Sequence, residues 1–127
     1  MSATAPGVAR ATAGLRVFVA PGEAPLAAVV SALTARLPAP PRVERVEPYW
    51  KEEGWHVVTW ELGEWAAPEE ALDAVTQALG TGWVVQADGW DSSATWNPGD
   101  GASFVDARVR FASVEILQRR APAPVRA

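Results

Sequence analysis

The sequence predicts an α+β fold, in which an antiparallel sheet carries two helices on one face. Two segments repeat apolar residues with the 3.6-residue period of amphipathic helices, and at least four have the β-branched and aromatic content of strands. The chain has 127 residues, of which 49% are hydrophobic and 20% charged. This length and balance are typical of a single globular domain with one core.

The first predicted strand is LRVFVA, residues 15–20, and a Pro-Gly pair ends it. Apolar residues then recur at i, i+3, i+4, i+7 and i+11 from Leu26 to Leu37, which is the stripe of an amphipathic helix. Three of the next four residues are prolines, so we expect this helix to end near Leu37.

A β-hairpin is predicted next, with strands at residues 42–50 and 55–62 joined by a turn at 51–54. Pro48 indicates an edge position or a bulge, because proline cannot donate a hydrogen bond to a neighbouring strand. Gly54 supplies the positive φ that such turns commonly need.

A second helix is expected to start at Pro68, a residue suited to the first helical turn, and to end before Gly80 as its C′ residue. Residues 83–87, WVVQA, return to a strand. The order is therefore strand, helix, hairpin, helix, strand, which is that of a ferredoxin-like βαββαβ plait.

Residues 108–117, RVRFASVEIL, predict an extra C-terminal strand at the sheet edge beside 83–87. A bulge near Ala112 and Ser113 would place four apolar residues on one face: Val109, Phe111, Val114 and Ile116. The segment 88–106 is too long for an ordinary structureless loop. Either residues 93–96 form a short strand of their own, or the loop is functional.

The expected organisation is a disordered arm at 1–13, a single α+β domain at 14–117, and a disordered, basic and proline-rich tail at 118–127. The chain has no cysteine, which excludes disulfides and thiolate metal sites. The first residues lack the apolar core of a signal peptide, and no apolar run is long enough to span a bilayer. We therefore expect a cytoplasmic protein with no membrane partner.

Charge is distributed unevenly along the chain. Residues 44–106 hold thirteen acidic residues against Arg45 and Lys51, a net charge of −11, whereas both flanking segments are positive. An acidic segment repels phosphate backbones, so nucleic acid is not an expected ligand. A basic protein surface is the expected partner.

The sequence contains no strong catalytic or cofactor-binding motif. A serine nucleophile needs a base, and His56, the single histidine, lies within a predicted strand. No glycine-rich phosphate loop is present. The loop residues Asp88, Asp91, Asp100, Asp106 and Asn97 offer oxygen ligands but lack the order of a calcium loop. No metal or cofactor is therefore expected; the alternative is a homodimeric small-ligand-binding or metal-dependent enzyme domain that uses these loop acids.

Seven tryptophans are more than two short helices can be expected to cover. In the hairpin, Trp55 and Trp60 must lie on opposite faces, because strand residues alternate. Exposed tryptophan with acidic neighbours is typical of a protein-binding surface. The predicted partner-binding residues are Trp50, Glu52, Glu53, Trp55, Trp60, Glu61, Trp90, Asp91 and Trp96. A homodimer formed through the open sheet face is the second possibility.

The segments VVTWELGEW and SSATWNPGDGASF, with the chain's size and charge pattern, resemble small bacterial immunity proteins that protect against polymorphic toxins. The resemblance covers the general character of residues 42–111 and assigns no role to any single residue. It implies a cytoplasmic, non-enzymatic protein that covers a basic partner, such as a nuclease toxin.

Overall fold

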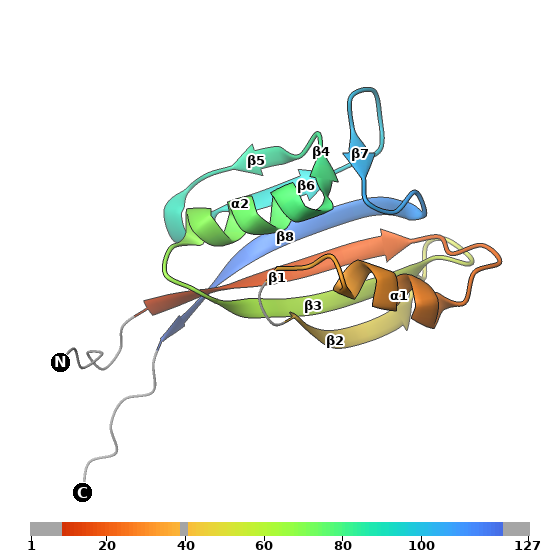
Figure 1. Cartoon of the computed structure of the whole chain (residues 1–127), viewed down its shortest axis with the longest axis horizontal. Coiled ribbons are helices and arrows are strands. Elements are labelled where there is room, and N and C mark those ends of the chain that lie inside the picture. Colours follow the sequence, from red (N-terminus) through yellow and green to blue (C-terminus); the bar gives the residue numbers. More distant parts are fainter. Residues whose placement is uncertain (1–8, 39–40, 121–127) are drawn as a thin grey trace, which may run out of the picture.

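The computed structural model describes residues 9–38 and 41–120, which fold into a sheet with both α-helices on one face (Figure 1). Within these residues a six-stranded sheet and a separate two-stranded sheet are present. The elements are β1 (Ala9–Val19), α1 (Leu26–Thr34), β2 (Pro41–Pro48), β3 (His56–Trp65), α2 (Pro68–Leu79), β4 (Gly80–Thr81), β5 (Val84–Gln86), the 3₁₀ helix η1 (Gly89–Asp91), β6 (Ser93–Trp96), β7 (Ser103–Phe104) and β8 (Val109–Arg120).

The strand order of the large sheet is β2-β3-β1-β8-β6-β5, and all the pairs in it are antiparallel. This confirms an α+β fold with two helices. The order differs from the predicted plait, because β8 lies in the middle of the sheet and separates β1 from β6 and β5. The prediction of β8 as an edge strand is therefore wrong. β8 has 12 residues and matches the 11 of β1, whereas β5 has three and, among the described residues, pairs only with β6.

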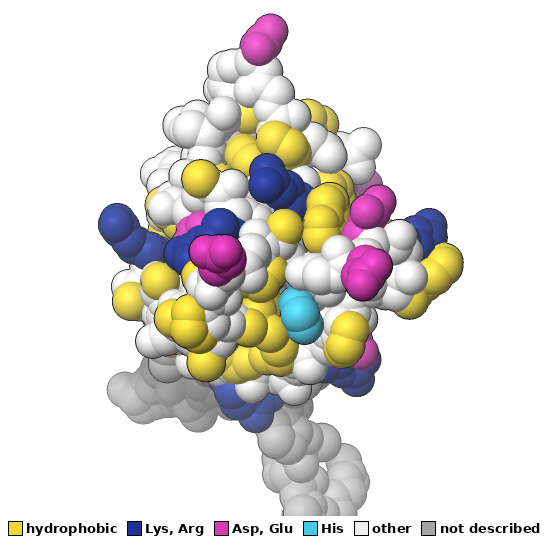
Figure 2. Space-filling model, turned by 90° about the vertical axis from the view of Figure 1, so that its right-hand side faces the viewer, with side chains coloured by type: hydrophobic (Ala, Val, Ile, Leu, Met, Phe, Trp, Pro, Cys, Tyr) yellow, Lys and Arg dark blue, Asp and Glu magenta, His cyan; other side chains and the backbone are white. Residues whose placement is uncertain are grey.

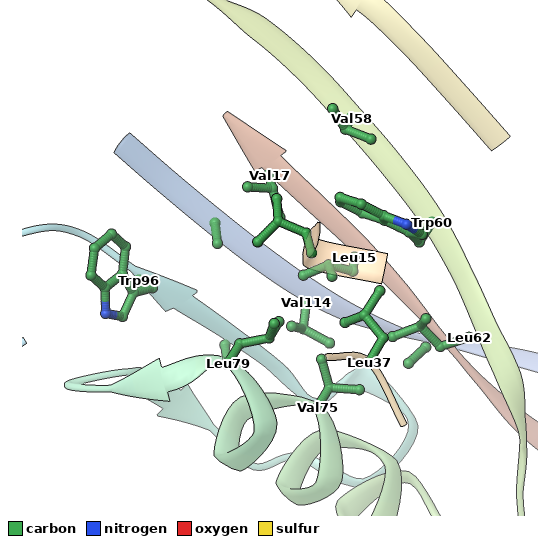
Figure 3. Packing of buried hydrophobic residues seen from close by; sticks show 14 of the residues in the cluster. Leu15, Val17, Leu37, Val58, Trp60, Leu62, Val75, Leu79, Trp96 and Val114 are labelled. Atoms are coloured by element: carbon green, nitrogen blue, oxygen red, sulfur yellow. The ribbon is translucent and has the colours of Figure 1, made fainter. Parts of the chain in front are cut away.

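The core lies between the sheet and the helices (Figure 3). Alternate residues of β1, such as Leu15 and Val17, point toward the helices and are at most 1% exposed. The stripe of α2 meets them with Val75 and Leu79, both fully buried, and α1 adds Leu33. The apolar periodicity of both helices thus identifies their buried faces correctly. Neither described helix is long and apolar enough to cross a membrane.

Both terminal segments are more ordered than expected. β1 begins at Ala9 and β8 continues to Arg120, and these residues pair with each other. Residues 9–13 and 118–120 are therefore strand rather than arm and tail. Ala11 and Ala13 are fully buried, but alanine has a low propensity for strands, so the sequence pattern did not indicate a strand here. The rest of the predicted arm and tail lies outside the described residues.

Three register shifts occur in the large sheet, one of them between Ala11 and Ala13 in the β1–β3 pairing, and the other two determine the faces of β8 and β2. In β8 the register passes from Phe18↔Phe111 to Val19↔Val109, so Arg110 is the extra residue. The predicted bulge at Ala112 and Ser113 is wrong, and Phe111 lies on the face away from the helices while Ala112 is buried. In β2 the register shifts between Val43 and Arg45, which leaves Glu44 as the extra residue. β2 is an edge strand, as Pro48 indicated.

The segment between α2 and β8 is built from short elements. Residues 93–96 form β6, which confirms the strand alternative for this segment. Gly80 does not act as a left-handed helix cap, because its φ of 170° is extended backbone. Its role is steric: a Cβ there would collide with the Ser103 carbonyl oxygen of β7. The short β4–β7 pair therefore requires glycine at this position.

Candidate functional site

The tryptophans divide into three groups. Trp60 and Trp96 are 0% and 4% exposed, whereas Trp50 is 83% exposed. The remaining four are half-buried: Trp55, Trp65, Trp83 and Trp90. The indole of Trp50, which is the most exposed of the seven, is a candidate contact for another molecule.

Two of the predicted partner-binding residues are structural. Trp60 points under α1, where its Nε1 donates to Thr34 Oγ1 at 3.0 Å. Trp96 Nε1 donates to the Thr81 carbonyl at 2.9 Å, and its ring packs 4.7 Å from that of Phe104. Both rings are buried with satisfied N–H groups, so the prediction that they contact a partner is wrong. The helix layer covers more of the sheet than expected.

The opposite face, here called the open face, carries a row of four aromatic rings. Trp55 stacks on Tyr49 with a centroid distance of 6.2 Å, and Tyr49 meets Phe18 edge-on at 4.8 Å. Phe18 in turn meets Phe111 at 5.4 Å. This aromatic row (Trp55, Tyr49, Phe18 and Phe111) crosses one end of the sheet. The predicted placement of Trp55 and Trp60 on opposite faces is confirmed.

Trp50 lies beside this row, on the turn between β2 and β3, and residues 50–55 are called the indole turn. The Tyr49 N–H donates to the Trp55 carbonyl at 2.9 Å, and Gly54 has a φ of 81°. The ring of Trp50 is 6.4 Å from that of Tyr49, and Lys51 Nζ lies 5.0 Å from its centroid. Glu52 and Glu53 are exposed on the same turn.

A hollow of about 890 Å³ lies between the indole turn and β2 on the open face. Its floor includes Phe18, Val57 and Arg16. Charged side chains of β2 form its wall: Arg42 pairs with Glu44 at 3.1 Å and Glu61 at 3.3 Å, and Arg45 with Glu47 at 3.9 Å. Figure 2 shows hydrophobic groups exposed near the histidine at this end of the molecule, interspersed with charged side chains.

Arg16 is exposed in the middle of the open face, between Thr59 of β3 and Ser113 of β8. Within the part of the chain that the structure describes, its guanidinium has no ion pair. The hollow therefore offers an available cation beside the aromatic rings of Phe18 and Tyr49.

The predicted site residues do not form one surface. Trp50, Glu52, Glu53 and Trp55 share the indole turn, and Glu61 lies further along β3, paired with Arg42. Trp90 and Asp91 are in η1, which precedes β6. β1 and β8 lie between β3 and β6 in the sheet. The strands β3 and β6, beside which these two groups lie, are therefore more than about 10 Å apart. The pairing of β1 with β8 joins residues that are far apart in the sequence, so no local sequence pattern predicted it.

The loop acids are dispersed as well. Asp106 accepts a hydrogen bond from Arg108 Nη2 at 2.6 Å, and this bond lowers the pKa of its carboxyl group. Among the described residues, no three His, Cys, Asp or Glu side chains lie close enough together to hold a metal ion. His56 Nδ1 is buried and has no hydrogen-bond partner in the described structure.

Sequence reasoning missed four residues of the open face: Arg16, Phe18, Tyr49 and Phe111. Strand alternation could have placed Phe18 on the open face, because its neighbours Val17 and Val19 face the helices. Phe111 carried no such signal, because the bulge at Arg110 reverses its face. No protein-family model, curated protein or solved structure matches this chain.

Proposed function

We propose that this protein is a non-enzymatic binding protein that engages a basic protein partner through the indole turn and the adjoining open face. The observation that carries the proposal is the exposure of Trp50, which leaves 83% of a large aromatic residue in water. Burial of such a ring in a complex can supply a large part of the binding free energy. The neighbouring aromatic row offers a continuous apolar surface around it.

The chemistry of the turn favours a cationic group on the partner. Lys51 Nζ already lies 5.0 Å from the centroid of the Trp50 ring, which is the geometry of a cation–π contact. An arginine from a partner could take the same position and approach Glu52 and Glu53. The net charge of −4 would speed the encounter with a basic protein.

The distribution of ionisable groups supports binding over catalysis. His56 is far along the chain from the loop acids, and the strand order places β3 and β6 apart. The described acids form no metal-ligating group. The proposed setting is the bacterial cytoplasm, with a basic toxin as the partner, as the resemblance to immunity proteins implies.

One observation favours a second candidate function, the binding of a small anionic ligand. The hollow of about 890 Å³ is large enough for a small molecule and contains Arg16, whose guanidinium has no ion pair among the described residues. A ligand with a carboxylate or phosphate beside a planar ring could pair with Arg16 and pack on Phe18.

The two candidates are separated by two variants. After the partner is isolated by affinity capture, calorimetry should show that Trp50→Ala weakens its binding roughly 30-fold or more, the loss expected at a hot spot. Arg16→Ala should not weaken this affinity, because a basic partner gains no attraction from a cation on the open face. If a small anion is the ligand instead, Arg16→Ala removes its binding and no protein partner is captured.

A matched control comes from the far edge of the sheet. Val84 in β5 is 64% exposed, so Val84→Ala also removes exposed apolar surface but should leave the affinity unchanged. Trp50→Ala itself should keep the unfolding free energy within about 0.5 kcal/mol of wild type, since the ring packs little in the monomer. Equal affinities for the wild type and Trp50→Ala would contradict the proposal.

A further inference from the structure

β2 is a long, unpaired edge of the sheet. Among the described residues it pairs with β3 on one side only, and seven of its eight residues are exposed. Val43 and Val46 are 39% and 45% exposed. They line an apolar groove of about 680 Å³ between β2 and α1, together with Leu26 and Val30. Such an edge is a template for another strand.

The side chains of β2 form a self-complementary pattern. Residues 42–47 read Arg-Val-Glu-Arg-Val-Glu. The four charged side chains line the hollow of the open face, whereas both valines line the groove beside α1, and Val43 also borders the hollow. The bulge at Glu44 produces this symmetry, because it places Glu44 and Arg45 consecutively on the same face. Read from either end, the faces follow the same order.

We propose that β2 is the site where a second copy of this chain pairs, antiparallel, about a twofold axis between residues 44 and 45. In this register Arg42 faces Glu47 of the second copy, and Glu44 faces its Arg45. Val43 faces the second copy's Val46 on the helix side. Every charge thus meets its opposite and every valine meets a valine, so the strand is complementary to itself.

Other registers match less of the strand. A shift of one residue brings valines opposite charges and exchanges the faces. A shift of two residues places Arg42 opposite Arg45 or Glu44 opposite Glu47. A shift of three residues again pairs opposite charges and valines, but over three residues of the strand instead of six. The proposed register therefore has the longest complementary match, and its occupant is a second copy.

The backbone geometry agrees with this pairing. The Tyr49 N–H points toward β3, where it donates to the Trp55 carbonyl. Alternation along an antiparallel strand then turns the N–H and carbonyl of Val46 outward, toward the free edge. These groups are available to Val43 of the second copy. Pro41 and Pro48, which have no N–H, bound the paired segment at both ends.

The test uses two charge variants of the full chain, each with a like-charged β2. The double variant Arg42→Glu/Arg45→Glu has an all-acidic strand, and Glu44→Arg/Glu47→Arg has an all-basic one. Sedimentation equilibrium should find a dimer for the wild type and a monomer for each variant alone. An equimolar mixture of the two variants should recover the dimer, because the acidic strand is complementary to the basic one.

The mixture keeps the test independent of folding defects, since a variant that merely unfolds would not recover a dimer with its counterpart. The control is Val85→Arg, which adds a charge at the opposite edge on β5 and should leave the dimer intact. In the wild type, amide exchange at Val46 should slow as the protein concentration rises.

A monomeric wild type would overturn the proposal. So would a dimer that persists in both charge variants, because it would place the contact on another surface, such as the open face. The proposal is also separable from the proposed function: Trp50→Ala should leave the dimer unchanged, and partner binding at the indole turn does not require β2 pairing.

Discussion

At the scale of single residues, the environment decides what one side-chain type does. Trp60 packs fully buried under α1 and anchors the helix, because its Nε1 donates to Thr34 Oγ1 while Thr34 itself donates to the Val30 carbonyl at 2.7 Å. Truncation of such a ring costs about 3–5 kcal/mol. Trp50 makes no comparable contacts and is available to another molecule.

Asp106 and Arg108 provide a test at this scale. The hydrogen bond from Arg108 lowers the pKa of Asp106 below its ordinary value of 3.8. The ionised carboxylate therefore adds stability that is present above pH 3.8 and is lost as the pH falls through the lower, folded-state pKa. We expect Asp106→Asn to be less stable than the wild type at neutral pH and to approach it in acid.

Urea unfolding, followed by circular dichroism from neutral to acidic pH, measures the difference in unfolding free energy between Asp106→Asn and the wild type. The control is Asp100→Asn, at an exposed position of the loop between β6 and β7. This control should stay close to the wild type at every pH. A constant difference between Asp106→Asn and the wild type would show that the ion pair does not set the pH dependence.

At the scale of elements, local patterns predicted both helices and the β2–β3 hairpin, since periodicity and turn residues act within a few positions, and they left β6 as one of two alternatives. Alternation also predicted that Trp55 and Trp60 point in opposite directions. It could not say which one faces the helices, because that depends on where α1 packs. The bulges at Glu44 and Arg110 were missed for the same reason: a bulge is fixed by the register of the partner strand.

Gly80 tests the junction between α2 and the β4–β7 pair. A Cβ at this position would collide with the Ser103 carbonyl oxygen and lie 3.0 Å from Phe104 Cα, so the two strands would have to separate. We expect Gly80→Ala to lower the unfolding free energy by about 1–3 kcal/mol, as overpacking does. Chemical denaturation is the measurement.

Gly99→Ala is the matched control, because its Cβ would meet nothing within 4 Å and its φ is not in the left-handed region. It should change stability by no more than about 0.5 kcal/mol. Equal stabilities of the two alanine variants would mean that β7 can move away from α2 at no cost.

At the scale of the whole molecule, the two ends of the described chain meet. β1 pairs with β8 along nearly its whole length, from Ala9↔Arg120 to Val19↔Val109. Figure 1 shows both strands in the middle of the sheet. No local signal in the sequence could place β8 there, because its partner lies almost a full chain length away. This long-range pairing is what separates the predicted plait from the observed strand order.

The position of β8 predicts that the domain folds only once its last strand is present. β8 contributes Val109, Val114 and Ile116 to the core and joins β1 to β6, so its removal exposes the centre of the sheet. We expect a chain that ends at Arg108 to lose its cooperative thermal transition, measured by near-ultraviolet circular dichroism. Val85→Pro, which disrupts β5 at the edge, should retain that transition, because β5 pairs with β6 alone. If the truncated chain still melts cooperatively, the remaining elements form a core of their own, and β8 does not hold the two halves of the sheet together.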